Sequence, residues 1–326
     1  MNRSVYCYRP MELKFNINIF LLIIIFLLIS GCGIIRRAAV KQIGDTLSSE
    51  KTMAVLSSDN DPDLVWEAMP FALKTMEVML AQDPLNDNLQ LALASGYIQY
   101  TYGHLAWKAR ITEDIDYNKS RHLWNRVYNL SLRGRDYALS ELDYRYPDFS
   151  KKVRIDTKST LAKTSKEDVP LLYWAAAGWA GAISANKSDM ENMAELPVAV
   201  AMMRRVLELD ENYRDGAVHE FFIAYETGQP NANNENMKKA EMHFKKVIEY
   251  TKGKKAYPYV LFAESVAVKK QDLSLFKKLL NQALAVNVNE VKKWRLVNTI
   301  AQEQARWLQG RIPILFLDYK KDEYDR

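Results

Sequence analysis

The chain has 326 residues, with 45 basic and 40 acidic side chains and a formal net charge of +5. Three of the basic residues and one acidic residue lie in the first 31 positions, so residues 32–326 carry a formal charge of only +3. A charge this close to neutral argues against a nucleic-acid-binding protein, which would present a large basic excess. The length allows one large hydrophobic core or two smaller domains.

The first element is an apolar run, Ile19–Ile29, followed by two small residues and Cys32. It is shorter than the roughly 18 to 20 residues that span a bilayer comfortably. Basic residues precede it, as in a secretory signal peptide. We therefore expect residues 1–31 to be a lipoprotein signal peptide and Cys32 to be lipidated. A plain membrane-anchor helix is the alternative, because residues 33–35 prolong the apolar character. The basic residues are Arg3, Arg9 and Lys14.

The expected lipid anchor has consequences for the rest of the chain. Cys7 and Cys32 are the only cysteines, so the mature body has no thiol for a disulfide, a thiolate metal site or a cysteine nucleophile. Residues 32–60 are expected to form a tether with room for one short helix. The periplasmic face of a membrane is the expected location, and Gly33 after the cysteine favours the outer membrane. Three basic residues could contact anionic headgroups or simply be solvated, and both readings stay open: Arg36, Arg37 and Lys41.

Residues 61–310 predict an all-α domain. The chain has only 12 glycines and 10 prolines, and no alternating strand pattern is evident. Asp61-Pro62 can begin a helix, because aspartate caps a helix and proline suits its first turn. Asp83-Pro84 then separates this helix from a second one over Leu85–Lys108.

A second helical pair is expected over Tyr117–Leu132 and from Arg133 to Tyr146, followed by a polar segment at Lys151–Lys166. The next helix, from Asp168 to Ser184, is apolar on two faces. Such a helix is buried from two sides, so we expect it near the centre of the fold.

The C-terminal half contains degenerate repeats. A helix over Asp189–Leu209 is expected to kink at Pro197. Residues 207–228 resemble a junction between tetratricopeptide repeats, although an insertion at 229–236 departs from their period. Three further helices complete the predicted stack of tetratricopeptide-like helical hairpins. A tail at 311–326 follows, and we expect its residues 312–317 to dock onto the helical body. The three helices cover residues 257–268, 273–286 and 291–309.

Several separated sequence blocks occur in one order and resemble the TRAP transporter TatT component family, whose members are periplasm-facing lipoproteins with cryptic tetratricopeptide repeats. The resemblance covers most of the mature chain. The blocks are residues 59–64 with 68–74, residues 91–97 with Gln99 and Tyr100, residues 132–139, and residues 168–174 with Trp179.

This resemblance implies a scaffold without catalytic activity that assembles as a homo-oligomer such as a trimer. It also implies docking of the substrate-binding subunit of a tripartite ATP-independent periplasmic transporter, with a role in passing its ligand. The ligand pocket would lie in the partner, so the chain does not identify the substrate. The residues alone leave an alternative, a general cell-envelope assembly lipoprotein, because stacked helical pairs commonly bind other proteins through a free side.

Candidate ligand- or partner-binding residues lie in two places. Arg133, Arg135, Asp136 and Tyr137 are expected at the start of a helix, where a guanidinium could bind a carboxylate of a ligand or partner. The favoured alternative is an internal Arg–Asp pair that joins neighbouring helices. A second candidate set, Trp174 and Trp179, could line an inner passage, although tryptophans on a helix of small residues are more often core.

No motif predicts catalysis, a metal or a cofactor. The four histidines lack the spacing of a metal site, and no GxSxG or GxxxxGK motif occurs. Asp59, Asp61 and Asp63 imitate a calcium loop, but its glycine and its terminal glutamate are missing. A lysine-rich run could face lipid or an acidic partner, and a solvated helix face is favoured. Its residues are Lys238, Lys239, Lys245, Lys246, Lys252, Lys254 and Lys255.

Overall fold

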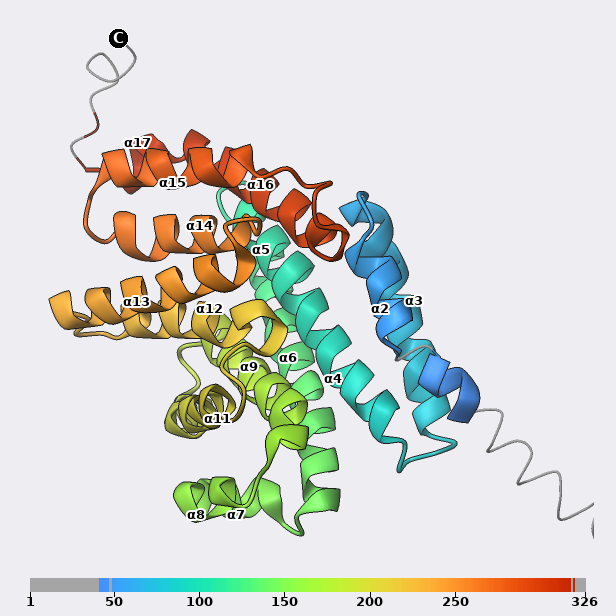
Figure 1. Cartoon of the computed structure of the whole chain (residues 1–326). Coiled ribbons are helices and arrows are strands. Elements are labelled where there is room, and N and C mark those ends of the chain that lie inside the picture. The colour runs from blue at the N-terminus through green and yellow to red at the C-terminus, as the bar shows by residue number, and fades with distance from the viewer. Residues whose placement is uncertain (1–40, 47–48, 318, 320–326) are drawn as a thin grey trace, which may run out of the picture.

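The computed structural model describes residues 41–46, 49–317 and 319. These residues contain helices, turns and no strand, so the all-α prediction is confirmed. The helices pack as one body (Figure 1). In the described part of the chain, no helix combines the length and the apolar character that crossing a membrane requires. The predicted signal peptide and Cys32 lie outside these residues.

The α-helices have the following bounds in chain order: α2 (Glu50–Ser57), α3 (Pro62–Leu80), α4 (Asp87–Tyr100), α5 (Ala106–Thr112), α6 (Tyr117–Arg145), α7 (Phe149–Ile155), α8 (Thr157–Ala162), α9 (Val169–Ala185), α10 (Met190–Ala194), α11 (Leu196–Leu209), α12 (Tyr213–Gly228), α13 (Asn234–Thr251), α14 (Tyr257–Phe262), α15 (Leu273–Ala285), α16 (Arg295–Gly310) and α17 (Ile312–Leu315). One π-helical segment, Thr101–Leu105, joins α4 to α5, and another, Ala263–Ala267, extends α14. The second predicted helix therefore continues past Lys108 to Thr112.

Side-chain caps determine where several helices begin. The Asp61 carboxylate accepts a hydrogen bond from the Leu64 amide at 3.1 Å, and Pro62 occupies the first turn of α3, as predicted. Asn86 caps α4 in the same way, by accepting a hydrogen bond from the Leu89 amide at 2.9 Å. Asp116 caps α6 through the Lys119 amide at 3.0 Å.

The predicted break between Leu132 and Arg133 is wrong, because α6 runs through it as one helix of 29 residues. Gly134, inside this continuous helix, serves close packing. A side chain at this position would come within 2.9 Å of Ile98 and 3.1 Å of the Ala94 carbonyl oxygen. The glycine therefore allows α4 to approach α6 closely, at a cost in helix propensity of roughly 1 kcal/mol relative to alanine.

The helix α9 lies at the centre of the fold, as its two apolar faces predict. It packs against α4, α6, α11 and α12, and Leu172, Ala176 and Trp179 are among its buried residues. The main hydrophobic core surrounds it on both sides. Close contact with α6 depends on Gly178, where a side chain would come within 2.7 Å of the Ser131 carbonyl oxygen.

Two further expectations need correction. The polar segment at Lys151–Lys166 is largely helical, since α7 and α8 occupy it, with Val153 and Leu161 buried in the main core. Pro197 does not kink a long helix. It lies in the first turn of α11, after the separate short helix α10, where its missing amide is not needed.

The C-terminal half forms a stack of neighbouring helices, α12 to α16, with its own hydrophobic cluster (Figure 1). Ile312 and Phe316 are buried in this cluster, so the predicted docking of residues 312–317 is confirmed for these two side chains. The tetratricopeptide-like order of the stack stays a prediction. At the other end of the chain, α2 packs against α16, and Leu56 contacts the cluster between α3 and α4.

Candidate functional site

The carboxylate of Glu77 on α3 collects donors from its own helix, α4 and α6. The hydroxyl groups of Tyr97 and Tyr137 donate to Glu77 Oε1 at 2.6 and 2.9 Å, and Arg133 Nη1 lies 3.6 Å from the same oxygen. Lys74 forms an ion pair with Glu77 Oε2. The Tyr97 and Tyr137 rings stack with centroids 6.1 Å apart. Arg133 and Tyr137, two of the predicted site residues, therefore belong to an internal network.

The protonation states of this network are well defined. Burial opposes the charge on Glu77, but the hydrogen bonds from Lys74, Tyr97 and Tyr137 outweigh it and hold the pKa of Glu77 below its ordinary value. Burial, together with the negative charge of Glu77, raises the pKa of Tyr97 to about 12. The same causes raise the pKa of Tyr137. At neutral pH the carboxylate is ionised and both phenols remain donors.

Arg135 and Asp136 form a second cluster on the α9 side of α6. Arg135 Nε and Nη2 donate to Asp136 Oδ1 at 2.8 and 2.7 Å, so this pair lies within one helix. The guanidinium groups of Arg135 and Arg154 lie over the buried Trp179 ring, 5.0 and 4.7 Å from its centroid. Arg135 therefore adds a cation–π contact to the close packing of α6 against α9, whereas the Asp136 carboxylate is bonded within its own helix.

Trp174 lies in a third place. It is buried, and Arg214 lies 5.0 Å above its ring while Tyr173 meets it edge-on at 4.9 Å. The six candidate residues are thus distributed over three clusters. The arrangement brings Arg133 together with Tyr137, and Arg135 together with Asp136 and Trp179, but it does not bring all six to one site.

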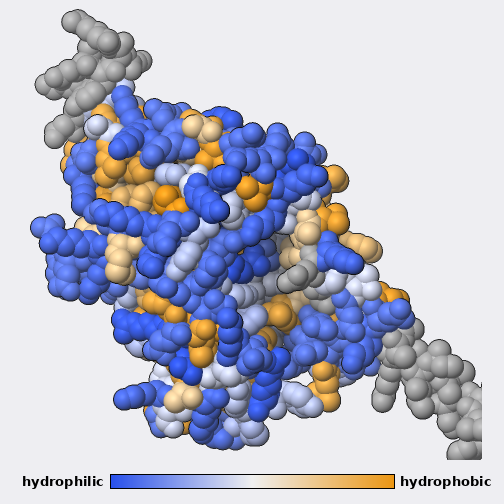
Figure 2. Space-filling model, viewed as in Figure 1, coloured by the Kyte–Doolittle hydropathy of each residue, from blue (hydrophilic) through white to orange (hydrophobic). Residues whose placement is uncertain are grey.

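We infer a recess between these clusters and the C-terminal stack from the surroundings of three tyrosines, Tyr102, Tyr173 and Tyr257. Tyr102 exposes 46% of its surface, yet its hydroxyl donates to the Ala177 carbonyl of α9 at 3.2 Å, and surrounding protein raises its pKa. A side chain that water can touch but that protein surrounds lines a concave space. Burial also raises the pKa values of Tyr173 and Tyr257, and both phenols lie within electrostatic range of Tyr102 and Glu220. The space-filling view shows a hollow near the middle of the molecule (Figure 2).

Two of the cations around this recess are compensated by carboxylates. Arg110 pairs with Glu264, and Lys255 Nζ lies 2.7 Å from Glu220 Oε1. The recess therefore offers phenol hydroxyls and aromatic faces, with Arg214 as a further cation near Tyr173. Such a lining suits a small molecule that has both polar and apolar parts.

Sequence reasoning missed the recess because its residues come from distant segments. Tyr102 belongs to the π-helical segment between α4 and α5, whereas Tyr173 lies on α9 and Tyr257 on α14. The only sequence signal is the abundance of tyrosine, with 18 in the chain. Glu77 was also missed, because an isolated glutamate in an amphipathic helix resembles an ordinary solvated side chain.

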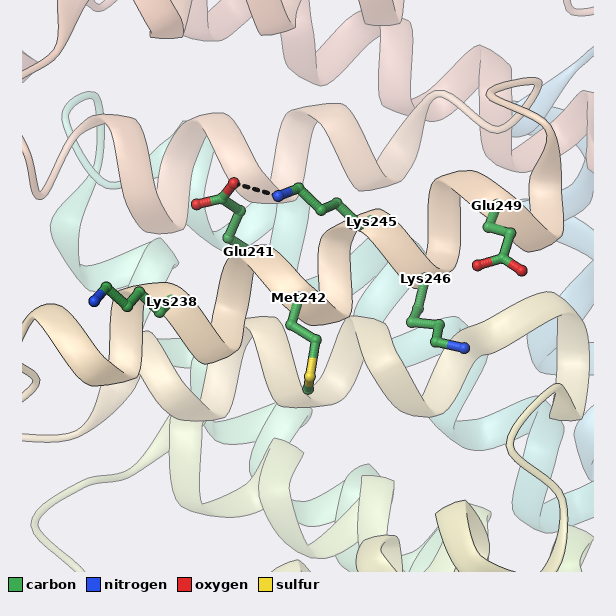
Figure 3. Close-up of a pocket in the computed structure, with 6 residues that line it drawn as sticks. All are labelled: Lys238, Glu241, Met242, Lys245, Lys246 and Glu249. Atoms are coloured by element: carbon green, nitrogen blue, oxygen red, sulfur yellow. Dashed lines mark ion pairs between the residues drawn. The ribbon is translucent and has the colours of Figure 1, made fainter.

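The outer face of α13 carries a shallow pocket that contains three of the seven lysines of the lysine-rich run (Figure 3). Glutamates compensate several of these lysines: Lys245 lies 2.7 Å from Glu241, and Lys239 lies 2.9 Å from Glu235. This supports a solvated helix face without a strong positive field. Lys255 is the one lysine of the run that does not lie on this solvated face, because its side chain is buried beside the recess. The pocket is lined by Lys238, Glu241, Met242, Lys245, Lys246 and Glu249.

Two histidines that are far apart in the sequence meet between α12 and α13. His219 Nδ1 and His243 Nδ1 are 2.8 Å apart, and both side chains are buried. Glu211 Oε1 lies 3.5 Å from His219 Nε2. Among the residues that the structure describes, no group of three or more histidine, cysteine, aspartate or glutamate side chains is arranged to hold a metal ion.

Comparison with known proteins identifies the family. The sequence profile of the TRAP transporter T-component family matches residues 58–316. The chain is also 26% identical over 308 residues to an uncharacterized protein of Treponema pallidum (strain Nichols), a match that covers 90% of this chain and 95% of that protein. The family match spans α3 to α17, the helices that build the Glu77 network, the recess and the C-terminal stack. The chain therefore belongs to the TRAP transporter T-component family.

Proposed function

We propose that this chain is a helical scaffold that docks the substrate-binding subunit of a TRAP transporter and helps to pass its ligand. Membership of the family gives an accessory role in the transporter and a position on the periplasmic side. The docking step and the passage of ligand are our extension. The observation that supports it is the group of tyrosines around the inferred recess, which would give a small molecule a place to bind.

The recess suits transient binding better than tight storage. Its ion pairs are internal, so a bound anion would have to compete with Glu220 for Lys255 or with Glu264 for Arg110. A ligand that is passed from one protein to another must bind weakly and reversibly on the way, and contacts with phenol groups would allow this. The Glu77 network and the Trp179 cation–π contact hold the helices around the recess at fixed distances.

The anchor and the assembly complete the proposal. Lipidation of Cys32 would hold the body at a membrane surface that faces the periplasm, where a soluble substrate-binding subunit could reach it. The lipoprotein is proposed to function as a homo-oligomer, the state that the resemblance to the family implies. Outer-membrane attachment is the favoured arrangement.

The docking proposal can be tested with purified components. The detergent-solubilised lipoprotein is mixed with the substrate-binding subunit of the same organism, and the complex is followed by size-exclusion chromatography with light scattering. A stable or rapidly exchanging complex supports docking. Absence of any complex, together with co-purification of cell-wall or outer-membrane assembly proteins from the native membrane, would instead favour a general envelope role.

Passage of ligand is tested separately with matched tyrosine variants. Tyr102→Ala removes a phenol from the recess, whereas Tyr144→Ala removes an exposed phenol of α6. We expect Tyr102→Ala to slow transfer of radiolabelled ligand into transporter vesicles at least several-fold while the docked complex persists. Equal transfer rates for both variants would contradict a role of the recess.

A further inference from the structure

The surface formed by α7 and α8 carries an excess of positive charge. Residues 148–167, which include both helices, contain six basic and three acidic side chains. This excess of three charges equals the formal charge of the whole of residues 32–326, so the remainder of those residues is balanced. The basic residues of the surface are Lys151, Lys152, Arg154, Lys158, Lys163 and Lys166.

Three of these lysines have no acidic partner. Lys151, Lys158 and Lys163 are exposed and form no ion pair with any residue that the structure describes. One of the nearby carboxylates, that of Asp156, caps α8 by accepting a hydrogen bond from the Ser159 amide at 3.1 Å. The other three basic side chains are paired: Arg154 lies 3.0 Å from Glu195, Lys152 lies 3.6 Å from Asp148, and Lys166 lies 3.6 Å from Asp210.

An exposed isoleucine lies among these lysines. Ile155, the last residue of α7, is 86% exposed, whereas Phe149 and Val153 of the same helix are buried. Lys151 and Ile155 are four residues apart and therefore share the outward side of α7. An apolar side chain with basic neighbours suits the surface of a bilayer, because the apolar group can enter the headgroup layer while the lysines reach the phosphates.

This surface lies at the end of the body where α4 begins. The helix α6 runs antiparallel to the helical segment 87–112. Ser120 Oγ donates to the Ala109 carbonyl at 2.8 Å, whereas Tyr137, later in α6, stacks on Tyr97, earlier in that segment. The end of α6 and the start of α4 therefore lie at the same end, and α7 follows α6 directly. Figure 1 shows α7 and α8 at this end and α17 at the opposite one.

The expected anchor enters the body at the same end. Asn88 Nδ2, at the start of α4, donates to Asp45 Oδ1 at 2.9 Å. Nine residue steps separate Cys32 from Lys41, so the two are at most about 32 Å apart, because an extended chain advances no more than about 3.6 Å per residue. The 29 residues of α6 alone measure about 44 Å. A lipid on Cys32 would therefore hold the end with α7 and α8 nearer to the bilayer than the opposite end.

We propose that α7 and α8 form a contact surface for anionic phospholipids. Lys151, Lys158 and Lys163 bind headgroup phosphates, and Ile155 enters the headgroup layer. The inference rests on the lipid anchor of the proposed function and adds an orientation of the body on the membrane. Lipid is favoured over an acidic protein, because the anchor holds this end beside the bilayer at a high effective concentration. The test needs no substrate-binding subunit, so a failure of docking would not affect it.

Two single-cysteine variants of the full lipoprotein test the surface. Ile155→Cys and Ile314→Cys replace isoleucines at opposite ends of the body, 86% and 65% exposed. Each variant is labelled with the environment-sensitive dye NBD and reconstituted into phosphatidylcholine vesicles with or without phosphatidylglycerol. With phosphatidylglycerol, we expect the emission of NBD at residue 155 to shift to shorter wavelength. A lipid with a nitroxide just below its headgroup should also quench this dye. NBD at residue 314 should respond in neither way.

Charge reversal tests the lysines. Lys151→Glu combined with Lys158→Glu, in the Ile155→Cys background, should reduce the quenching. One basic side chain near an anionic leaflet favours binding about fivefold, so the loss of two should weaken the contact by at least about tenfold. Lys270→Glu combined with Lys278→Glu is the matched control. It makes the same change in net charge on exposed residues of the C-terminal stack and should leave the quenching unchanged.

Flotation with the vesicles separates the anchor from the surface. A protein that floats with both kinds of vesicle, but whose dye at residue 155 is not quenched, would retain the anchor and overturn the surface. The parent chain should take up no dye, since an acylated Cys32 has no thiol. Labelling of the parent, or its failure to float, would overturn the anchor on which the inference rests.

Three further results would contradict the proposal. Equal quenching at residues 155 and 314 would show that the body has no preferred end toward the membrane. Quenching that survives charge reversal would show that the lysines do not bind headgroups. A dye at residue 155 that responds to the substrate-binding subunit, but not to lipid, would assign the surface to a protein partner.

Discussion

Replacing Gly178 by alanine tests the closest approach in the fold, that of α6 to α9. The new Cβ would lie 2.7 Å from the Ser131 carbonyl oxygen and 3.0 Å from both the backbone nitrogen and the Cβ of Arg135. Two of these three atoms belong to the backbone of α6, so no rotamer change can relieve the contact. One of the two helices at the centre of the core must move by several tenths of an ångström or more.

The expected magnitude follows from two opposing effects. Overpacking of a filled core costs about 1–3 kcal/mol, whereas replacing glycine by alanine inside a helix gains up to about 1 kcal/mol. The net loss should therefore be about 1–2 kcal/mol in the free energy of unfolding. For a body of this size, that corresponds to a decrease in Tm of roughly 2–8 °C.

Urea denaturation followed by circular dichroism, together with calorimetry, measures this loss. Gly228→Ala is the matched control, because a Cβ at the end of α12 would meet nothing within 4 Å. We expect the control to be as stable as the parent or slightly more stable. If Gly178→Ala were equally stable, α6 and α9 could not approach as closely as described, and the packing around α9 would be wrong.

Three other outcomes are expected. Glu77→Gln removes the charge that Tyr97 and its neighbours contact, and should cost about 1–3 kcal/mol in urea denaturation at pH 7; an unchanged midpoint would show that the network contributes nothing to stability. Burial and the neighbouring His243 lower the pKa of His219 to about 4 from its ordinary 6.5, so the unfolded state binds the proton first as the pH falls. The contribution of His219 to the free energy of unfolding should thus be full above pH 6.5 and decline between pH 6.5 and pH 4, by about 2 kcal/mol at pH 5. His219→Phe should reduce this dependence of stability on pH. An unaltered pH dependence in that variant would assign the loss of stability to other groups. Mass spectrometry of the membrane-bound protein should find an acylated Cys32 at its N-terminus, and an unmodified Cys32 still preceded by residues 1–31 would favour an uncleaved anchor helix.

The sequence predicted helices best where local chemistry decides their ends. Asp61 and Pro62 start α3 as expected, and the two apolar faces of α9 correctly indicate its central position. Prediction from the sequence failed where a residue serves tertiary packing. Gly134 looks like a break, but it lies in the interior of α6 because α4 must pass close to it. Pro197 fits the first turn of a new helix as well as it fits a kink, and only the neighbouring chain distinguishes the two.

The candidate site was harder to predict, because its geometry depends on contacts between distant segments. Arg133 and Tyr137 are four residues apart and therefore share one side of α6, which places both near Glu77, but nothing in the sequence identifies that glutamate as their partner. Tyr102 illustrates the same limit. Its exposure and its surroundings depend on α9, some 75 residues further along the chain.

The packing of the N-terminal segment has a mechanical consequence. Arg295 Nη1 at the start of α16 donates to the carbonyl oxygen of Ser58, at the end of α2, at 3.2 Å. Leu56 inserts into the cluster formed by α3, α4 and α16. A force applied through a membrane anchor would therefore be divided between the first and the last layers of the protein. In the proposed lipid-anchored form, a pull on α2 would reach the C-terminal helices directly, without passing through the helices between them.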